Sequence, residues 1–117
     1  MKPIVMRASC AALLVAGFAA AAAAQEAVYA RNLSSACFTC HGTDGRSVGN
    51  VPPSLAGRDK AELLQLLKDF KSGQRPATLM HQQAKGYTDQ QLETIAGYFA
   101  GIARGPAAAA PAGRASY

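Results

Sequence analysis

The sequence has little of what most folds of its length use to stabilise a core. It contains no tryptophan, aromatic residues make up 7% of its 117 residues, and charged residues make up 16%. The hydrophobic share of 50% overstates the core, because ten alanines precede Gln25 and six follow Arg104. Roughly 80 residues are left for a fold, and a core of that size is marginal without a disulfide, a metal or a buried cofactor. This composition argues against a long disordered chain, a coiled coil or a multi-domain enzyme.

A long stretch near the N-terminus lacks charge altogether. The start of the chain is basic, positions 8–24 carry no charge, and an Ala-x-Ala pattern ends at Ala24. This order is typical of a secretory leader, so we expect residues 1–24 to be a cleaved signal peptide and the mature protein to lie in the periplasm. The alternative is a retained membrane anchor, because the stretch is about long enough to cross a bilayer. Its high alanine content favours cleavage.

The rest of the chain lacks a strong charge of either sign. Removal of the two basic residues of the leader lowers the formal net charge from +5 to +3. This surplus is mild and the basic residues form no run, so no nucleic-acid partner is expected.

Hydrophobic periodicity indicates short helices and no strands, so the expected fold class is all-α. A first helix is expected over residues 25–36. Four glycines and two adjacent prolines make residues 41–57 a loop. The leucine-rich segment that begins at Asp59 is the clearest helix, and Gly73 is placed to end it.

Two further helices are expected beyond this point. Pro76 can begin a short helical turn that runs through Ala84. Thr88 begins the last helix, with Gln91 at the spacing of a capping box. The buried stripe of this helix is expected to comprise Leu92, Ile95, Ala96, Phe99 and Ile102.

The domain boundaries follow from these segments. Residues 25–103 hold all the predicted helices after the leader, and they form one domain, as the chain length suggests. Alanine, proline and glycine dominate residues 104–117. This tail has nothing to bury and is expected to be disordered.

The chemistry of the chain lies in one short motif, the Cys-x-x-Cys-His sequence formed by Cys37, Cys40 and His41. This spacing is an attachment signature of c-type haem. The two thiols reach the two vinyl positions on one side of the macrocycle, and the adjoining imidazole is delivered to the iron. The motif therefore predicts one covalent haem c, bound through Cys37 and Cys40, with His41 as an iron ligand.

Two other interpretations of the motif remain open at this point. A zinc site could use Cys37, Cys40, His41 and His81, but two adjacent ligands are unusual in tetrahedral sites. A redox-active disulfide between the two cysteines would normally accompany a βαβ pattern, and no strand is predicted here.

A second axial ligand can be sought among the remaining residues. Met1 and Met6 belong to the leader, so Met80 is the only methionine expected in the mature protein. It lies in a loop-like segment before the last helix, and we predict that its sulfur binds the iron. His81 is the rival ligand, and only one of these neighbours can face the iron. If neither binds, the distal face is open and a gas or redox sensor becomes the better interpretation.

Three segments give the chain a family resemblance. They are CFTCHG at residues 37–42, PSLAG at residues 53–57, and the stretch over residues 79–102. With these segments the chain resembles class I c-type cytochromes of the bacterial c4/c553-like group, and especially the cytochrome subunit of flavocytochrome c sulfide dehydrogenases. The resemblance implies about four short helices around one covalent haem. It also implies that the carbonyl of Pro53 accepts a hydrogen bond from His41, which would orient the imidazole.

The resemblance and the motif together predict a periplasmic one-electron carrier that docks briefly with redox proteins. Methionine–histidine ligation favours ferrous iron and suits electron transfer. The alternative is the haem-bearing electron-acceptor subunit of a flavoprotein dehydrogenase that oxidises a sulfur compound. No flavin or dinucleotide motif occurs in the sequence, so we expect no catalysis by this chain itself.

Two further groups of residues have expected roles. The apolar residues expected to line or support the haem pocket are Leu63, Leu66, Leu67, Phe70, Leu92, Ile95 and Phe99. The basic residues that could frame a docking surface are Lys60, Lys68, Lys71, Arg75 and Lys85, although a solvated surface is the simpler interpretation of these charges.

Overall fold

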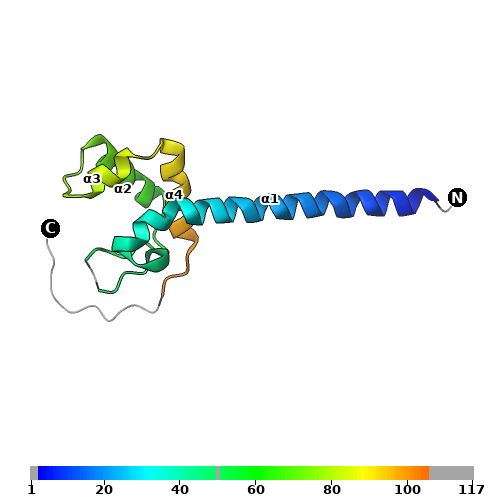
Figure 1. Cartoon of the computed structure of the whole chain (residues 1–117), viewed down its shortest axis with the longest axis horizontal. Coiled ribbons are helices and arrows are strands. Elements are labelled where there is room, and N and C mark those ends of the chain that lie inside the picture. Colours follow the sequence, from blue (N-terminus) through cyan, green and yellow to red (C-terminus); the bar gives the residue numbers. More distant parts are fainter. Residues whose placement is uncertain (1–2, 50, 106–117) are drawn as a thin grey trace.

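The computed structural model describes residues 3–49 and 51–105, and for residues 3–16 it describes the backbone alone. The elements are the helices α1 (Pro3–His41), α2 (Lys60–Ser72), α3 (Met80–Lys85) and α4 (Asp89–Gly101), with a short 3₁₀ helix η1 (Thr43–Gly45) after α1. No strand occurs in these residues, and the predicted all-α class is confirmed. In Figure 1, α1 projects as a rod from the group formed by α2, α3 and α4.

The first helix is longer at both ends than the predicted range of residues 25–36. It continues without a break from the leader through the Cys-x-x-Cys-His motif to His41. The reason is that no glycine or proline occurs between Gly17 and Gly42, and alanine has the highest helix propensity of all residues. Within the described chain, no helix combines the length and the hydropathy that a membrane span requires. Most of the predicted disordered tail, from residue 106 on, lies outside the described residues.

The predicted caps of α2 and α4 are confirmed. The Asp59 side chain accepts a hydrogen bond from the backbone N–H of Glu62 at 2.9 Å, and Gly73 ends α2 in a left-handed conformation. At the start of α4, the backbone N–H of Gln91 donates to the Thr88 hydroxyl at 3.2 Å. The Gln91 side chain in turn accepts from the backbone N–H of Thr88 at 2.9 Å. These contacts satisfy donors that a helix leaves unpaired at its start.

The predicted first residue of the third helix was wrong. Helix α3 begins at Met80 rather than Pro76, so Met80 is the first residue of a helix and does not lie in a loop. The carbonyl of Leu79 accepts from the backbone N–H groups of both Gln82 and Gln83, at 2.9 and 3.1 Å, and this fixes the first turn. The preceding segment contains Thr78, whose β-branched side chain disfavours helix.

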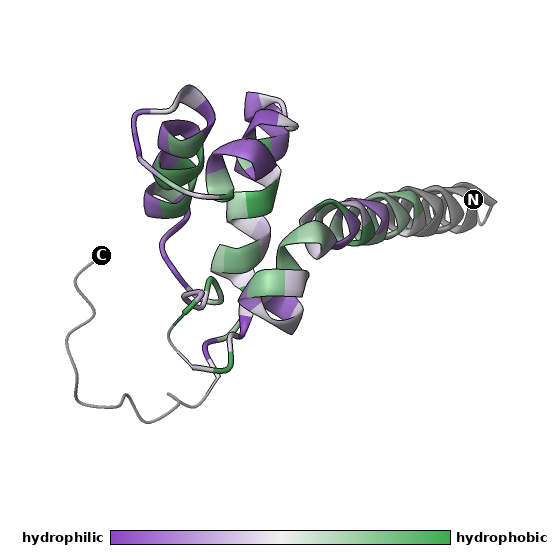
Figure 2. Ribbon diagram, turned by 60° about the vertical axis from the view of Figure 1, so that its left-hand side comes forward, coloured by the Kyte–Doolittle hydropathy of each residue, from purple (hydrophilic) through white to green (hydrophobic). Residues whose placement is uncertain are grey.

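The core lies where α4 packs against α1 and α2. Figure 2 shows apolar and polar bands alternating along these helices, as expected for amphipathic elements. The buried cluster consists of Leu63, Ile95, Ala96 and Phe99. Leu92 is also buried, but Ile102, predicted in the same stripe, is only half-buried. Beyond these side chains the core is thin, in keeping with the small size of the domain.

An aromatic cluster joins the end of α1 to α4. The ring centroids of Phe38 and Phe99 lie 6.1 Å apart, and those of Tyr98 and Phe99 lie 5.2 Å apart, both in edge-to-face geometry. Such pairs contribute about 0.5–1.5 kcal/mol each beyond the area that they bury. The cluster therefore holds the last turns of α1 against α4.

The close approach of η1 to this cluster gives a prediction. Gly45 has φ +75°, and a Cβ atom there would lie 2.7 Å from Cδ1 of Phe99. We expect Gly45→Ala to lower the free energy of unfolding by about 2–4 kcal/mol, from left-handed strain and overpacking together. The measurement is denaturant unfolding of the purified protein.

Gly49→Ala is the matched control for this prediction. Gly49 has φ +91°, but no described atom beyond its chain neighbours lies within 4 Å of the position that a Cβ atom would take, so only the backbone strain is introduced. It should cost about 1–2 kcal/mol. Equal losses in the two variants would contradict the contact between η1 and Phe99.

Candidate functional site

Both cysteines of the motif lie in the last turn and a half of α1, and both are free. Residues three apart on a helix share a face, so the Cys37 and Cys40 thiols lie on the same side. Cys37 is half-buried and Cys40 is exposed. Burial, and to a lesser degree the neighbouring Cys40, raises the pKa of the Cys37 thiol. Two thiols side by side at the edge of the core suit a group that is attached at two points.

His41 ends α1 and is almost fully buried. Its Nδ1 atom donates a hydrogen bond to the carbonyl oxygen of Pro53 at 2.7 Å, as the family resemblance implied. Because this bond takes the proton at Nδ1, the Nε2 atom carries a free lone pair and can bind a metal. The donor set of two thiols and one oriented imidazole therefore fits covalent haem.

The loop between η1 and α2 holds the Pro53 carbonyl in place through its own hydrogen bonds. The Ser47 hydroxyl donates to the Pro52 carbonyl at 2.5 Å, and the Ser47 backbone N–H donates to the Ser54 hydroxyl at 3.0 Å. The backbone N–H of Leu55 donates to the Gly45 carbonyl at 2.8 Å. Pro53 is thus flanked on both sides by fixed residues.

Glycine is required directly after His41. Gly42 has φ +78°, and a Cβ atom at this position would clash with the carbonyl oxygen of Arg46. The chain can therefore turn sharply away from α1 and bring the Pro53 loop back under the imidazole. The Cys-x-x-Cys-His-Gly sequence is one structural unit for this reason.

A charged cluster around Asp44 supports the same turn, and it was not predicted from the sequence. The Tyr98 hydroxyl donates to Oδ1 of Asp44 at 2.5 Å, Arg31 Nε lies 3.5 Å from the same oxygen, and Arg46 Nη1 lies 3.9 Å from Oδ2. Asp44 itself has φ 55°. The Arg31 guanidinium also lies 5.6 Å from the Phe38 ring centroid. The cluster joins α1, η1 and α4, and no sequence signal links residues so far apart.

Met80 and His81 occupy the start of α3, which packs against α2. Met80 is half-buried, and its role as an iron ligand stays a prediction. The His81 side chain lines a cavity between α2 and α3 together with Arg75 and Lys85. Among the described residues, no three His, Cys, Asp or Glu side chains converge on one point, so the ligands considered for zinc are not gathered.

Apolar surface remains uncovered on α2 and on the loops before and after it. Of the leucine-rich face of α2 only Leu63 is buried, while Leu66, Leu67 and Phe70 are partly exposed. Leu79 is 65% exposed and Val51 is 69% exposed. Exposed side chains of this size are expected where a large apolar group completes the core.

Comparisons with known proteins agree with this geometry. The family model described as cytochrome c oxidase, cbb3-type, subunit III matches residues 20–99. The chain is 43% identical over 72 residues to the cytochrome subunit of sulfide dehydrogenase from Chlorobaculum tepidum, a match that covers 62% of this chain and 64% of that protein. It is 37% identical over 78 residues to cytochrome c4 from Pseudomonas aeruginosa, covering 67% of this chain and 39% of that protein.

A solved structure matches as well. Cytochrome c4 of Acidithiobacillus ferrooxidans superposes with a TM-score of 0.61 at 32% identity, covering 66% of this chain and 50% of that chain. In each of these three comparisons, the matched region spans less than two thirds of the other protein's length.

The Asp44 cluster gives a prediction for alkaline pH. Burial, together with the Asp44 carboxylate, raises the pKa of Tyr98 above its ordinary value. The folded protein therefore keeps the phenol proton to higher pH than the unfolded chain does, whose tyrosines titrate near pH 10. The free energy of unfolding should fall as pH rises through and above about 10. Tyr98→Phe should flatten this fall and should lower stability at neutral pH by about 1 kcal/mol.

Tyr29→Phe is the control, because Tyr29 is exposed on α1. Denaturant unfolding at several pH values between neutral and alkaline compares the three proteins. The interpretation is wrong if Tyr98→Phe and the parent protein show the same pH dependence.

Proposed function

Since the chain belongs to the cytochrome c family, we propose that it is a one-electron carrier with a single covalent haem c. When bound, haem supplies an iron that takes up and releases one electron at a time. The observation that carries the proposal is the His41 imidazole, buried and fixed through Nδ1 on the Pro53 carbonyl, beside two free thiols. One haem is proposed because the sequence contains one Cys-x-x-Cys-His motif.

The chain supplies attachment, orientation and cover for this group. Cys37 and Cys40 would form the thioether bonds, and His41 would offer Nε2 to the iron. The Pro53 carbonyl makes the imidazole a better donor, because its hydrogen bond raises ligand basicity. The partly exposed leucines of α2 would provide apolar contact, and their burial against the haem would stabilise the fold.

We propose Met80 as the distal ligand. It is the only methionine beyond the leader. It begins a helix that packs against α2, and Leu67 of α2 packs against the same buried cluster as Cys37. The adjacent His81 lines the cavity with Arg75 and Lys85, which favours the methionine over the histidine. If Met80 and His41 both held the iron, small substrates would be kept off it, which favours an electron carrier over a gas sensor.

The proposed location is the periplasm, after removal of residues 1–24. Every residue from 17 to 29 is exposed, and Ser34 is the first buried residue among those of α1 whose side chains the structure describes. Cleavage after Ala24 would therefore leave the packed part of α1 intact. The part removed is the outer end of the rod in Figure 1.

A second function is favoured by the 43% identity to the cytochrome subunit of sulfide dehydrogenase. In that case the chain is the electron-accepting subunit of a larger oxidoreductase, with a flavoprotein as its partner and no catalysis of its own. Purification from the native host in high salt distinguishes the two, because a subunit keeps its partner and a free carrier does not.

Haem attachment is tested with the motif cysteines. Cys37→Ala combined with Cys40→Ala should remove all covalent haem and leave a largely unfolded chain, because about 80 residues bury too little apolar surface by themselves. Mass spectrometry after acid extraction and circular dichroism measure the two effects. Thr39→Ala, an exposed change inside the same motif, should keep one haem per chain. A cooperative melt of the double variant would refute the proposed dependence on haem.

Distal ligation is tested by comparing Met80→Ala with His81→Ala. Met80→Ala should keep the covalent haem but lower the reduction potential, because a thioether favours ferrous iron more than water or nitrogen does. It should also gain affinity for carbon monoxide and lose the near-infrared absorption band from sulfur to ferric iron. His81→Ala should leave this band unchanged. If His81→Ala changes the spectrum and Met80→Ala does not, the protein is a bis-histidine cytochrome. If neither variant changes the spectrum, the gas or redox sensor is favoured.

A further inference from the structure

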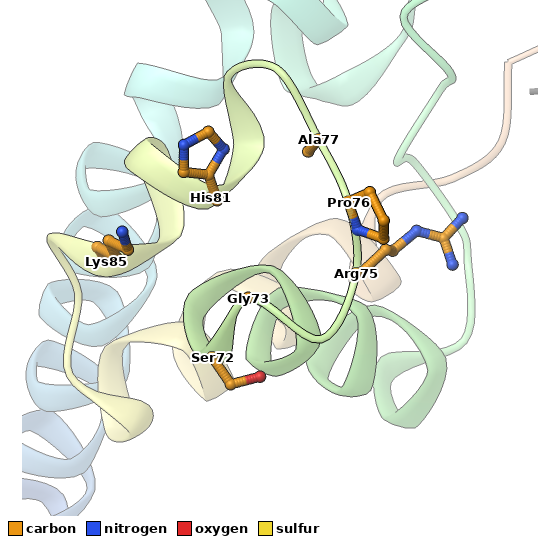
Figure 3. Close-up of a pocket in the computed structure, with 7 residues that line it drawn as sticks. All are labelled: Ser72, Gly73, Arg75, Pro76, Ala77, His81 and Lys85. Atoms are coloured by element: carbon orange, nitrogen blue, oxygen red, sulfur yellow. The ribbon is translucent and has the colours of Figure 1, made fainter.

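A cavity of about 290 Å³ lies between the end of α2 and the helix α3. Figure 3 shows the side chains around it, which come from the last residue of α2, the following loop and α3. Its polar side chains are Ser72, Arg75, His81 and Lys85, and the other lining residues are the small residues Gly73, Pro76 and Ala77. In the part of the chain that the structure describes, no carboxylate lines this cavity.

The positive charge of this cavity is not neutralised by an ion pair, unlike the charge of two lysines on α2. Lys71 pairs with Asp89 at 2.6 Å, and Lys60 pairs with Glu93 at 2.8 Å. Arg75 and Lys85, by contrast, form no ion pair with a described residue. Two helix C-termini lie near the cavity, and each carries about half a unit of negative charge. A net positive charge remains after this offset.

The guanidinium of Arg75 is held in place although it has no anionic partner. It lies 5.6 Å from the centroid of the Phe70 ring, in a cation–π contact. A positioned side chain loses less conformational entropy on binding than a free one. Arg75 is therefore prepared for an anionic group that is supplied from outside the chain.

The arrangement of the charges indicates what kind of anion fits. Figure 3 shows His81 and Lys85 on one side of the cavity and Arg75 on the other, with its guanidinium turned away from Lys85. These groups do not converge on a single point, so one small ion would contact only one of them. Most of the lining residues are also exposed, and an isolated ion pair in contact with water contributes little. A ligand with several carboxylates spread over a surface fits better, because it reaches both sides and excludes water.

We propose that this cavity is a docking site for an acidic surface of a redox protein, with carboxylates of the partner reaching Arg75 and Lys85. The proposal rests on the proposed function as an electron carrier and adds where the partner binds. His81 follows Met80 directly, so a partner seated here lies next to the proposed distal ligand. The +3 charge expected after leader removal gives only modest steering, which suits brief docking.

A titration of the haem-loaded protein with a capped hexaglutamate peptide tests the proposal. Backbone amide shifts in nuclear magnetic resonance spectra at low salt report where the peptide binds. We expect the largest shifts in residues 72–77 and 81–85. Arg75→Gln with Lys85→Gln should weaken the affinity at least about fivefold, a size that modest surface ion pairs allow.

The matched control removes the same charge from the other end of α2. Arg58→Gln with Lys60→Gln deletes one arginine and one lysine, both of which are paired with glutamates in the structure. This variant should bind the peptide within about twofold of the parent protein. Equal weakening in both double variants would overturn the proposal, because binding would then follow net charge alone. Largest shifts outside the cavity would overturn it as well.

Inorganic sulfate at matched ionic strength separates a protein surface from a small oxyanion. Sulfate that shifts the same residues with an affinity similar to that of the peptide would overturn the proposal in favour of a small-anion site. Failure of the proposed function is recognised separately, since it would appear as missing covalent haem or a missing methionine–iron band in the parent protein. Both double variants should keep the haem spectrum and the thermal melt of the parent.

Discussion

The bond from His41 Nδ1 to the Pro53 carbonyl is the interaction on which the arrangement of the site depends. It fixes the ring of the residue that ends α1, and it closes a loop of twelve residues back onto that helix. For the loop to close, the chain must turn sharply at Gly42, where any side chain would meet the Arg46 carbonyl. This turn also brings Gly45 against Phe99 of α4. The positions of the imidazole, the loop and α4 therefore depend on one another.

The small core explains why this chain needs an attached group. The buried cluster contains four side chains, and three of them come from α4. Helix α2 leaves most of its leucine face partly exposed. A group attached at the end of α1 would cover this surface without any additional residues. The stability of the fold therefore depends on the cofactor, because the haem would cover apolar surface that the protein alone leaves exposed to water.

The surface charges fall into two kinds. Around the α2–α4 packing, lysines pair with carboxylates across the helices, as Lys60 does with Glu93. Around Asp44, two arginines and a tyrosine share one carboxylate between α1, η1 and α4. These groups are engaged within the protein. Arg75 and Lys85 differ from these groups because, like Lys68 and Arg104, they form no ion pair with a described residue, and these two line one cavity.

Local features of the sequence determined much of this structure. The caps at Asp59 and Thr88, the stop at Gly73 and the motif at Cys37–His41 depend on neighbouring residues, whose contacts follow from spacing along the chain. The family resemblance implied the contact between His41 and Pro53. The end of α1 was misjudged because nothing local stops the helix before Gly42, and the start of α3 was misjudged because its first turn depends on Leu79.

Only the tertiary structure decided which distant side chains meet. Asp44 and Tyr98 lie 54 positions apart, and their contact exists because the end of α1 crosses α4. The same holds for the cavity of Arg75, His81 and Lys85, which forms where the loop after α2 returns through α3. Spacing along the chain predicts contacts within one helix or turn, whereas these contacts depend on the angles at which whole helices pack.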